Sequence, residues 1–309
     1  MGTDRRTALK ILAGAAAATA AGAATATGTA EAAATTPRQV PEEAVGMLYD
    51  TTLCIGCKAC VVACREANGM PTEAGPWPEG IYDAPVDLSS STRNIIKLYQ
   101  DGEEQSYMKA QCMHCVDPAC VGACMLGALR KDPKTGVVTW NGDTCVGCRY
   151  CQMACPFNVP KYEWTALNPR IVKCELCNHR LAEGKIPGCC EVCPRKAVIF
   201  GKRSDLLDEA KRRLAEHPDR YVPKIYGEHD GGGTQVLYLS HVPFEKLGLP
   251  DLGERSSADT ARGVQHTVYK GFIAPISLYA VLAAVMLYNK RREAAEGGAA
   301  GTSPENDHE

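Results

Sequence analysis

The stretch CIGCKACVVAC, residues 54–64, decides the fold, because it places four cysteines at intervals of three, three and four residues. Residues 145–156, CVGCRYCQMACP, repeat this spacing and add a proline. Two further quartets have wider gaps: C-x2-C-x4-C-x3-C in residues 112–124 and C-x2-C-x11-C-x3-C-P in residues 174–194. Cysteines in four similar quartets indicate a repeated ligand set, and therefore an internal repeat in the fold.

These quartets account for almost every cysteine of the chain. All 17 cysteines lie between Cys54 and Cys193, and the four quartets use sixteen of them. The three-residue gap before Cys193 selects Cys189 as its partner, which leaves Cys190 as the spare. We expect Cys190 to be a small buried hydrophobe rather than a sensor thiol or a substitute ligand.

The spacing C-x2-C-x2-C-x3-C, with a proline after the last cysteine, is typical of thiolate ligands to [4Fe-4S] clusters in bacterial ferredoxins. Small residues between the ligands, such as Gly56, Ala59 and Gly147, let backbone N–H groups approach the sulfurs. Zinc sites usually use two separated C-x2-C pairs, and a disulfide framework does not need this repeated spacing. The sequence therefore favours four [4Fe-4S] clusters, with zinc and disulfides as the alternatives.

Strand-like segments surround the quartets. They are residues 47–53, 136–140 and 197–200, together with a predicted hairpin over 94–109 that turns at Asp101-Gly102. Strand, cluster loop, helix and strand follow one another twice. We therefore predict an α+β fold with two tandem two-cluster ferredoxin-like modules with insertions, plus one C-terminal transmembrane helix. The chain has only four Phe and three Trp, so metal ligation must supply much of the folding energy.

The chain divides into segments of different composition. Arg5-Arg6 followed by an Ala-rich run is typical of a twin-arginine export signal. A surface helix is expected over 204–217, with Ser204 as its cap, and a linker over 249–263. The predicted segments are a signal peptide (1–34), a linker (35–46), a double ferredoxin-like domain (47–203), a C-terminal extension (204–263), a membrane anchor (264–292) and a disordered cytoplasmic tail (293–309).

Residues 271–288 contain no charged side chain and would span about 27 Å as a helix, close to the thickness of a bilayer core. Lys290, Arg291 and Arg292 follow at once, which predicts a cytoplasmic C-terminus. The protein is therefore expected on the periplasmic side of the cytoplasmic membrane, exported by the twin-arginine route and held by a single helix. Since this span has no His, Asp, Glu, Lys or Arg, quinone chemistry is expected in another subunit.

The remaining sequence shows no nucleophile dyad, nucleotide loop or organic-cofactor site, which favours electron transfer over catalysis. The net charge of −2 gives no signal for nucleic-acid binding. His114 lies between two candidate ligands, yet the thiols already complete each quartet, so we expect a packing or hydrogen-bonding role rather than ligation or gating.

The sequence resembles four-cluster iron–sulfur subunits of molybdopterin oxidoreductases and membrane hydrogenases. The features that carry this resemblance are the segment CMHCVDPAC (residues 112–120), the order of the quartets and the C-x11-C interval. Within this group, the sequence most resembles HybA-type subunits of membrane-bound uptake [NiFe] hydrogenases. This narrower resemblance rests on residues 226–229 (YGEH) and 234–239 (TQVLYL), the export signal and the predicted membrane helix. This resemblance implies an electron relay between the hydrogenase small and large subunits and an integral membrane, quinone-reactive (HybB-like) subunit. We hypothesise that the first and fourth quartets face the catalytic partner and that the second and third face the membrane.

The resemblance further implies that quartets share ligands across each module, although spacing alone would equally let each quartet hold its own cube. The four implied ligand sets are Cys54, Cys57, Cys60 and Cys193; Cys64, Cys174, Cys177 and Cys189; Cys112, Cys115, Cys120 and Cys155; and Cys124, Cys145, Cys148 and Cys151. The near alternative is the iron–sulfur β subunit of a respiratory formate dehydrogenase or another molybdopterin oxidoreductase. The distant alternative is a structural zinc protein with four-cysteine sites.

Overall fold

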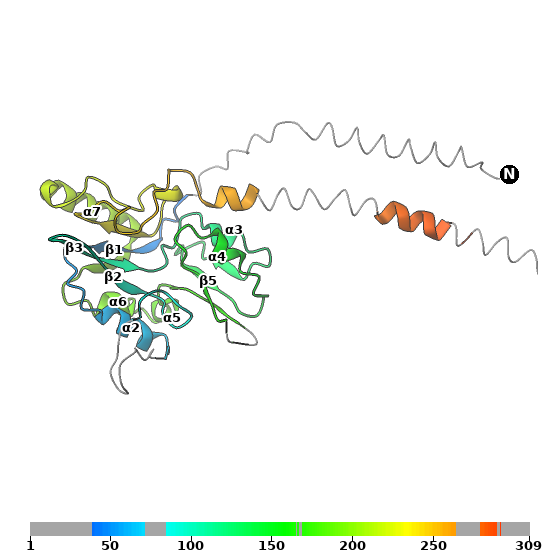
Figure 1. Cartoon of the computed structure of the whole chain (residues 1–309), viewed down its shortest axis with the longest axis horizontal. Helices are drawn as coiled ribbons and strands as arrows, with labels where there is room; N and C mark the ends of the chain where they lie inside the picture. The colour runs from blue at the N-terminus through cyan, green and yellow to red at the C-terminus, as the bar shows by residue number, and fades with distance from the viewer. Residues whose placement is uncertain are drawn as a thin grey trace, which may run out of the picture. The chain divides into compact units, whose positions relative to one another are not determined.

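The computed structural model describes residues 39–71, 85–164, 166, 169–263, 279–288 and 291 (Figure 1). The predicted signal peptide and cytoplasmic tail lie outside these residues, as do most of the predicted anchor and the first part of the predicted linker. The described part of the chain mixes helices and strands, as predicted for an α+β fold.

A three-stranded sheet brings together distant parts of the chain. Its strands are β1 (Val45–Asp50), β8 (Val198–Lys202) and β9 (Val236–Leu239). The order is β8-β1-β9, with β1 antiparallel to β8 and parallel to β9. Successive side chains of β1 alternate between the two faces. Met47 and Tyr49 enter the main apolar core, whereas Leu48 packs with Leu237 on the opposite face.

Helix α7 (Arg203–Glu216) packs against β1 and β8 and confirms the helix predicted over 204–217. The predicted cap was wrong, because Lys202 is the N-cap residue and the Ser204 hydroxyl donates to Asp205 instead. The helix begins one residue earlier because Arg203 is buried and its Nε donates to the Thr234 carbonyl at 2.7 Å. Strand β9 and helix α7 both come from the predicted extension 204–263, whose boundary stays a prediction.

The predicted hairpin is confirmed as β2 (Ile95–Asp101) paired with β3 (Glu104–Ala110). Gly102 adopts the positive φ of 59° that this tight turn requires. Two tyrosine hydroxyls fasten the hairpin to the central sheet: Tyr49 donates to the Tyr107 carbonyl at 2.8 Å and Tyr238 to the Lys109 carbonyl at 2.7 Å. The hairpin therefore covers the face of the sheet that points into the main core.

Short elements hold the cysteine motifs in the rest of the domain. Two small hairpins pair β4 with β5 and β6 with β7. Their bounds are β4 (Leu129–Lys131), β5 (Val138–Trp140), β6 (Lys161–Tyr162) and β7 (Ile171–Val172). The short helices are α2 (Ala59–Ala67), α3 (Ala119–Gly122), α4 (Tyr150–Ala154), α5 (Asn178–Ala182) and α6 (Gly188–Glu191). Helices α2 and α6 meet closely, since a Cβ at Gly188 would lie 3.1 Å from the Ala63 carbonyl oxygen.

The segment predicted as a linker over 249–263 contacts the domain at α3. The buried carboxylate of Asp117 accepts hydrogen bonds from the Ser256 hydroxyl at 2.6 Å and from Arg262 Nη1 at 3.1 Å. Ala258 is fully buried and packs over Gly122. Residues 258–263 are helical.

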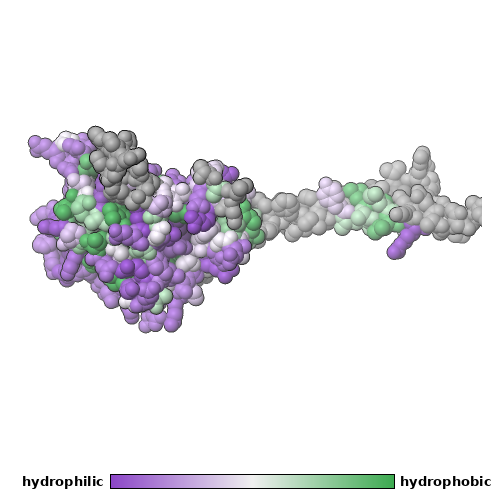
Figure 2. Space-filling view, turned by 90° about the horizontal axis from the view of Figure 1, so that it is seen from below, coloured by the Kyte–Doolittle hydropathy of each residue, from purple (hydrophilic) through white to green (hydrophobic). Residues whose placement is uncertain are grey.

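Within the described residues, no helix has both the length and the apolarity needed to cross a bilayer. Of the predicted apolar span, residues 271–278 lie outside the described part and residues 279–288 form a helix. Figure 2 shows hydrophobic residues along this helix. Its exposed large apolar side chains are Tyr279, Val281, Leu282, Val285, Met286, Leu287 and Tyr288.

Candidate metal centres

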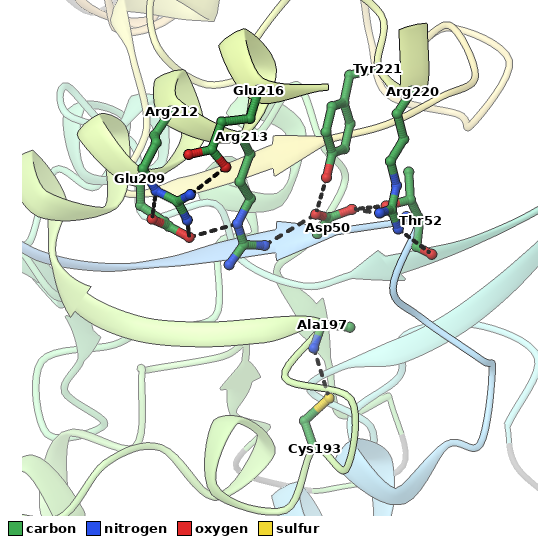
Figure 3. A network of polar contacts seen from close by, with 10 residues as sticks. All are labelled: Asp50, Thr52, Cys193, Ala197, Glu209, Arg212, Arg213, Glu216, Arg220 and Tyr221. Carbon is green, nitrogen blue, oxygen red and sulfur yellow. Dashed lines mark hydrogen bonds and ion pairs between the residues drawn. The ribbon is translucent and has the colours of Figure 1, made fainter. Parts of the chain in front are cut away.

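The first set of thiols comes from opposite ends of the cysteine region. One cavity is lined by Cys54, Cys57, Cys60 and Cys193, and its wall contains no carboxylate and no histidine. The pairing of β1 with β8 brings Cys193 to this place. The Asp50 N–H donates to the Ala197 carbonyl at 2.8 Å, and the Ala197 N–H donates to Cys193 Sγ at 3.3 Å (Figure 3).

A second cavity is lined by Cys64, Cys174, Cys177 and Cys189. Helix α2 contributes a cysteine to both cavities. Cys60 and Cys64 are one helical turn apart on α2, yet Cys60 lines the first cavity and Cys64 lines the second. The first quartet therefore divides its cysteines between two cavities, and the fourth quartet does the same with Cys193 and Cys189.

The other two sets come from the middle of the cysteine region. Cys124, Cys145, Cys148 and Cys151 line a third cavity, which again has no carboxylate in its wall. The remaining thiols gather around Cys115. Burial raises the pKa of the Cys115 thiol, and the charges of Cys120, Cys155 and Cys112 raise it further.

Burial favours the neutral form of several of these thiols. Desolvation raises the pKa of Cys60 and Cys151 to about 12 and the pKa of Cys64 and Cys155 to about 11. Thiolates are the form that binds iron, so loading must remove these protons and replace them with the positive charge of the metal. Four converging thiols fit an iron–sulfur cube. The second cavity also has Glu175 in its wall, but this carboxylate accepts from the Trp140 N–H and pairs with Arg93.

No three Cys, His, Asp or Glu side chains within the described ranges converge closely enough to hold one metal ion. A cube presents a separate iron to each thiolate, so its four ligands stand further apart than the four ligands of a single ion.

The four sets follow one another through the domain. The charge of Cys189 in the second set raises the pKa of Cys60 in the first. In the same way, Cys112 of the third set raises the pKa of Cys174 in the second. Cys151 of the fourth set also raises the pKa of Cys120 in the third. Charges interact strongly only at short range, so these couplings indicate a chain of neighbouring sites.

The ends of this chain of sites reach the protein surface. Cys57 in the first set and Cys148 in the fourth set are exposed, whereas all four cysteines of the second set are buried. The fourth set lies among exposed apolar side chains. These are Met125, Leu126, Val146, Tyr150 and Met153.

The first and third quartets share a local backbone geometry. Gly56 and Gly147 both have φ 69°, and the basic residue two positions later is also left-handed, with φ 59° at Lys58 and 64° at Arg149. The Gly56 N–H lies 3.4 Å from Cys54 Sγ, within reach of a hydrogen bond to sulfur. Glycine is therefore required here for both conformation and close approach.

Two residues singled out from the sequence have structural roles. His114 is fully buried, and its Nδ1 accepts a hydrogen bond from the Val138 N–H at 3.0 Å, which confirms the hydrogen-bonding role. Burial lowers the pKa of His114 well below its usual value, and the charges of Lys173 and Lys131 lower it further. Cys190 is buried in the main apolar core, as expected of a small hydrophobe.

Sequence analysis missed three lysines that lie close to the thiols. Lys109 is fully buried, and the buried Lys173 donates from Nζ to the Cys174 carbonyl at 3.0 Å. Lys131 Nζ donates to the Cys115 carbonyl at 2.8 Å. Burial alone would lower the pKa of Lys109, but the negative charges of Cys189, Cys60 and Cys174 raise it above its ordinary value. These three lysines lie on or directly after short strands, and no local sequence pattern distinguishes them from exposed lysines.

Four serial sets of thiols in a mixed α/β fold define an iron–sulfur electron-transfer protein with four [4Fe-4S] clusters. A family model described as a 4Fe-4S dicluster domain matches residues 104–203. The hydrogenase-2 operon protein HybA of Escherichia coli O157:H7 is 44% identical over 289 residues, covering 82% of this chain and 88% of that protein. The chain belongs to the HybA family of iron–sulfur subunits.

Iron–sulfur subunits of formate dehydrogenases are also similar. The nitrate-inducible formate dehydrogenase iron–sulfur subunit of Escherichia coli K12 is 34% identical, covering 79% of this chain and 83% of that protein. The formate dehydrogenase-O iron–sulfur subunit of the same strain is 37% identical, covering 70% and 74%.

Proposed function

We propose that the chain relays electrons between a periplasmic [NiFe] hydrogenase that oxidises hydrogen and a HybB-like quinone-reactive subunit in the membrane. The observation that carries this proposal is the serial arrangement of the four thiol sets. Exposed cysteines occur only in the first and last sets. A relay needs one site within reach of each partner and protected sites between them. The similarity to HybA supports hydrogenase as the source of electrons.

The proposed ligands are the four crossed sets. The three cavities support this assignment, because each is lined by exactly one implied set of four cysteines. The mutual charge effects of Cys112, Cys115, Cys120 and Cys155 support the remaining set. When bound, the clusters supply one-electron redox chemistry. The protein holds each cluster with four thiolates, buries all four ligands of the second set and keeps neighbouring clusters close. On this assignment, the fold consists of two tandem two-cluster modules.

The fourth set is proposed to face the membrane partner. Residues 258–263 contact the domain at α3, which contains Cys120 and ends two residues before Cys124. The proposed anchor 264–292 follows directly, with its apolar span at 271–288. The exposed apolar residues around the fourth set suit an interface with another subunit. The first set, with exposed Cys57, would then face the hydrogenase.

The proposed location is the periplasmic side of the cytoplasmic membrane. The twin-arginine motif supports export of a folded, cluster-loaded chain, and the basic residues 290–292 support a cytoplasmic C-terminus. The alternative function, relay from a formate dehydrogenase or another molybdopterin oxidoreductase, is supported by the relatives that are 34% and 37% identical.

Anaerobic purification of the native complex from membranes tests the proposal. The expected partner is a nickel-containing large subunit, and hydrogen should reduce the iron–sulfur signals of the complex. A pterin-containing partner, with reduction by formate and not by hydrogen, would establish the alternative.

A further inference from the structure

Lys109 is a charged side chain in an unusual position. It has 0% exposure and lies on β3, where Ser106 and Met108 are also buried. Its Nζ donates to Gln111 Oε1, and Gln111 in turn lines the cavity of the second thiol set. The ammonium group is thus one hydrogen bond away from that cavity.

The ammonium group lacks an acidic partner. Throughout residues 39–71, 85–164 and 169–263, no Asp or Glu side chain forms an ion pair with Lys109. Burying an unpaired charge costs several kcal/mol, so a buried lysine needs nearby negative charge to remain charged. A neutral glutamine oxygen supplies only part of this compensation.

Lys109 lies beside two thiol sets. Its cross-strand partner Ile96 lines the cavity of the first set, which includes Cys60, and Gln111 lines the cavity of the second set, which includes Cys174 and Cys189. The negative charges of these three thiols act on Lys109. A cube with four thiolates carries net negative charge, and reduction by one electron makes it more negative. A fixed positive charge beside it therefore favours the reduced state, especially where water is excluded.

We propose that Lys109 is the shared counter-ion of the first and second clusters and raises the reduction potentials of both. Gln111 is the positioning residue that orients the ammonium group toward the second cavity. This inference rests on the ligand sets assigned under the proposed function.

The test is an electron paramagnetic resonance redox titration of the anaerobically purified full-length protein with the Lys109→Met substitution. Methionine is also long and unbranched but carries no charge. Two of the four one-electron steps should move to more negative potential. At a fixed ambient potential, we expect the ratio of reduced to oxidised cluster to fall about tenfold, equivalent to about 59 mV for a one-electron step. The other two steps should stay in place.

Lys131→Met is the matched control, because Lys131 donates to backbone carbonyls beside the third set. The two steps that move in Lys109→Met should stay in place in this control. Lys109→Arg keeps the charge and should keep all four potentials near those of the native protein. The role of Lys109 is refuted if the Lys109→Met protein is fully loaded and no step moves, or if all four steps move equally.

Loss of iron in Lys109→Met is also informative. If Lys109→Arg restores about 16 iron atoms per chain, the charge is what the clusters need; if Lys109→Arg is equally depleted, the counter-ion role is refuted. A native protein without iron and acid-labile sulfide would instead refute the ligand assignment itself.

Discussion

The Tyr221 hydroxyl donates a hydrogen bond of 2.8 Å to Asp50 Oδ2, joining residues that are 171 positions apart. The same carboxylate oxygen forms an ion pair with Arg213 at 3.1 Å, and the Asp50 side chain has 0% exposure (Figure 3). Asp50 therefore holds both α7 and the segment after it against β1, one backbone hydrogen bond away from the loop that carries Cys193.

Asp50→Asn should destabilise the domain. Removing one partner of a buried ion pair costs about 3–5 kcal/mol, and Arg213 keeps Glu209 as a partner, so we expect the lower end of this range. A loss of about 3 kcal/mol lowers the melting temperature of a domain of this size by roughly 6–12 °C. Anaerobic thermal unfolding followed by circular dichroism measures this shift. Arg212→Gln, on the exposed side of α7, should leave the melting temperature unchanged, and an equal shift in both variants would contradict the role of Asp50.

Gly56→Ala should remove one cluster. A Cβ at Gly56 would lie 2.3 Å from the Tyr107 ring, and its φ of 69° is unfavourable for alanine. We expect a loss of about four iron atoms per chain, measured by iron analysis of the purified protein. Gly147→Ala should be milder, because its nearest neighbour is the Tyr162 hydroxyl at 3.1 Å.

Gly102→Ala is the control for these glycines. Gly102 also has a positive φ, but a Cβ there would meet nothing within 4 Å. This variant should keep all its iron. Equal iron loss in Gly56→Ala and Gly102→Ala would show that backbone strain alone, and not the contact with Tyr107, controls loading.

Removal of the clusters should unfold the domain unevenly. The apolar cluster between α7 and the sheet, which includes Leu48, Leu206 and Leu237, contains no cysteine among its described members. The cluster around Leu129 and Ile171 includes Cys120 and Cys151. In hydrogen exchange with mass spectrometry, α7 should remain protected after cluster removal, whereas β4, β5 and β7 should exchange at least tenfold faster. Uniform loss of protection would contradict an independent core under α7.

Val146→Glu should block electron transfer at the membrane end. Val146 is 71% exposed and lines the cavity of the fourth thiol set. A carboxylate buried there in an interface without a partner costs several kcal/mol, so hydrogen-dependent quinone reduction by the complex should fall at least tenfold. Hydrogen-dependent reduction of a soluble viologen dye should not change. Val86→Glu, at a side chain with 92% exposure, is the control, and an equal effect there would contradict this interface.

Local patterns predicted the hairpin and α7 well, because the Asp101-Gly102 turn and the stripe of Leu206 and Ala210 depend on neighbouring residues. Strand pairings between distant parts of the sequence could not be predicted. The parallel pairing of Met47 with Val236 depends on tertiary packing, and the Gly- and Ser-containing segment that binds Asp117 resembled a linker by composition.

The candidate site, too, was predictable from the sequence only in part. Spacing alone identified sixteen candidate ligands, since close ligation leaves a local pattern in the sequence. Spacing could not decide how the quartets share them, because this depends on which cavity each turn of α2 faces. It also could not reveal Lys109, whose burial depends on the hairpin covering the sheet.

The most direct test of the account is the iron content of two double variants. If Cys57 and Cys193 bind one cluster, Cys57→Ala with Cys193→Ala should lose about four of about 16 iron atoms. Cys189→Ala with Cys193→Ala should lose about eight, because these neighbours would serve different clusters. The reverse result, with the larger loss in the first pair, would mean that each quartet holds its own cube and would contradict the crossed relay.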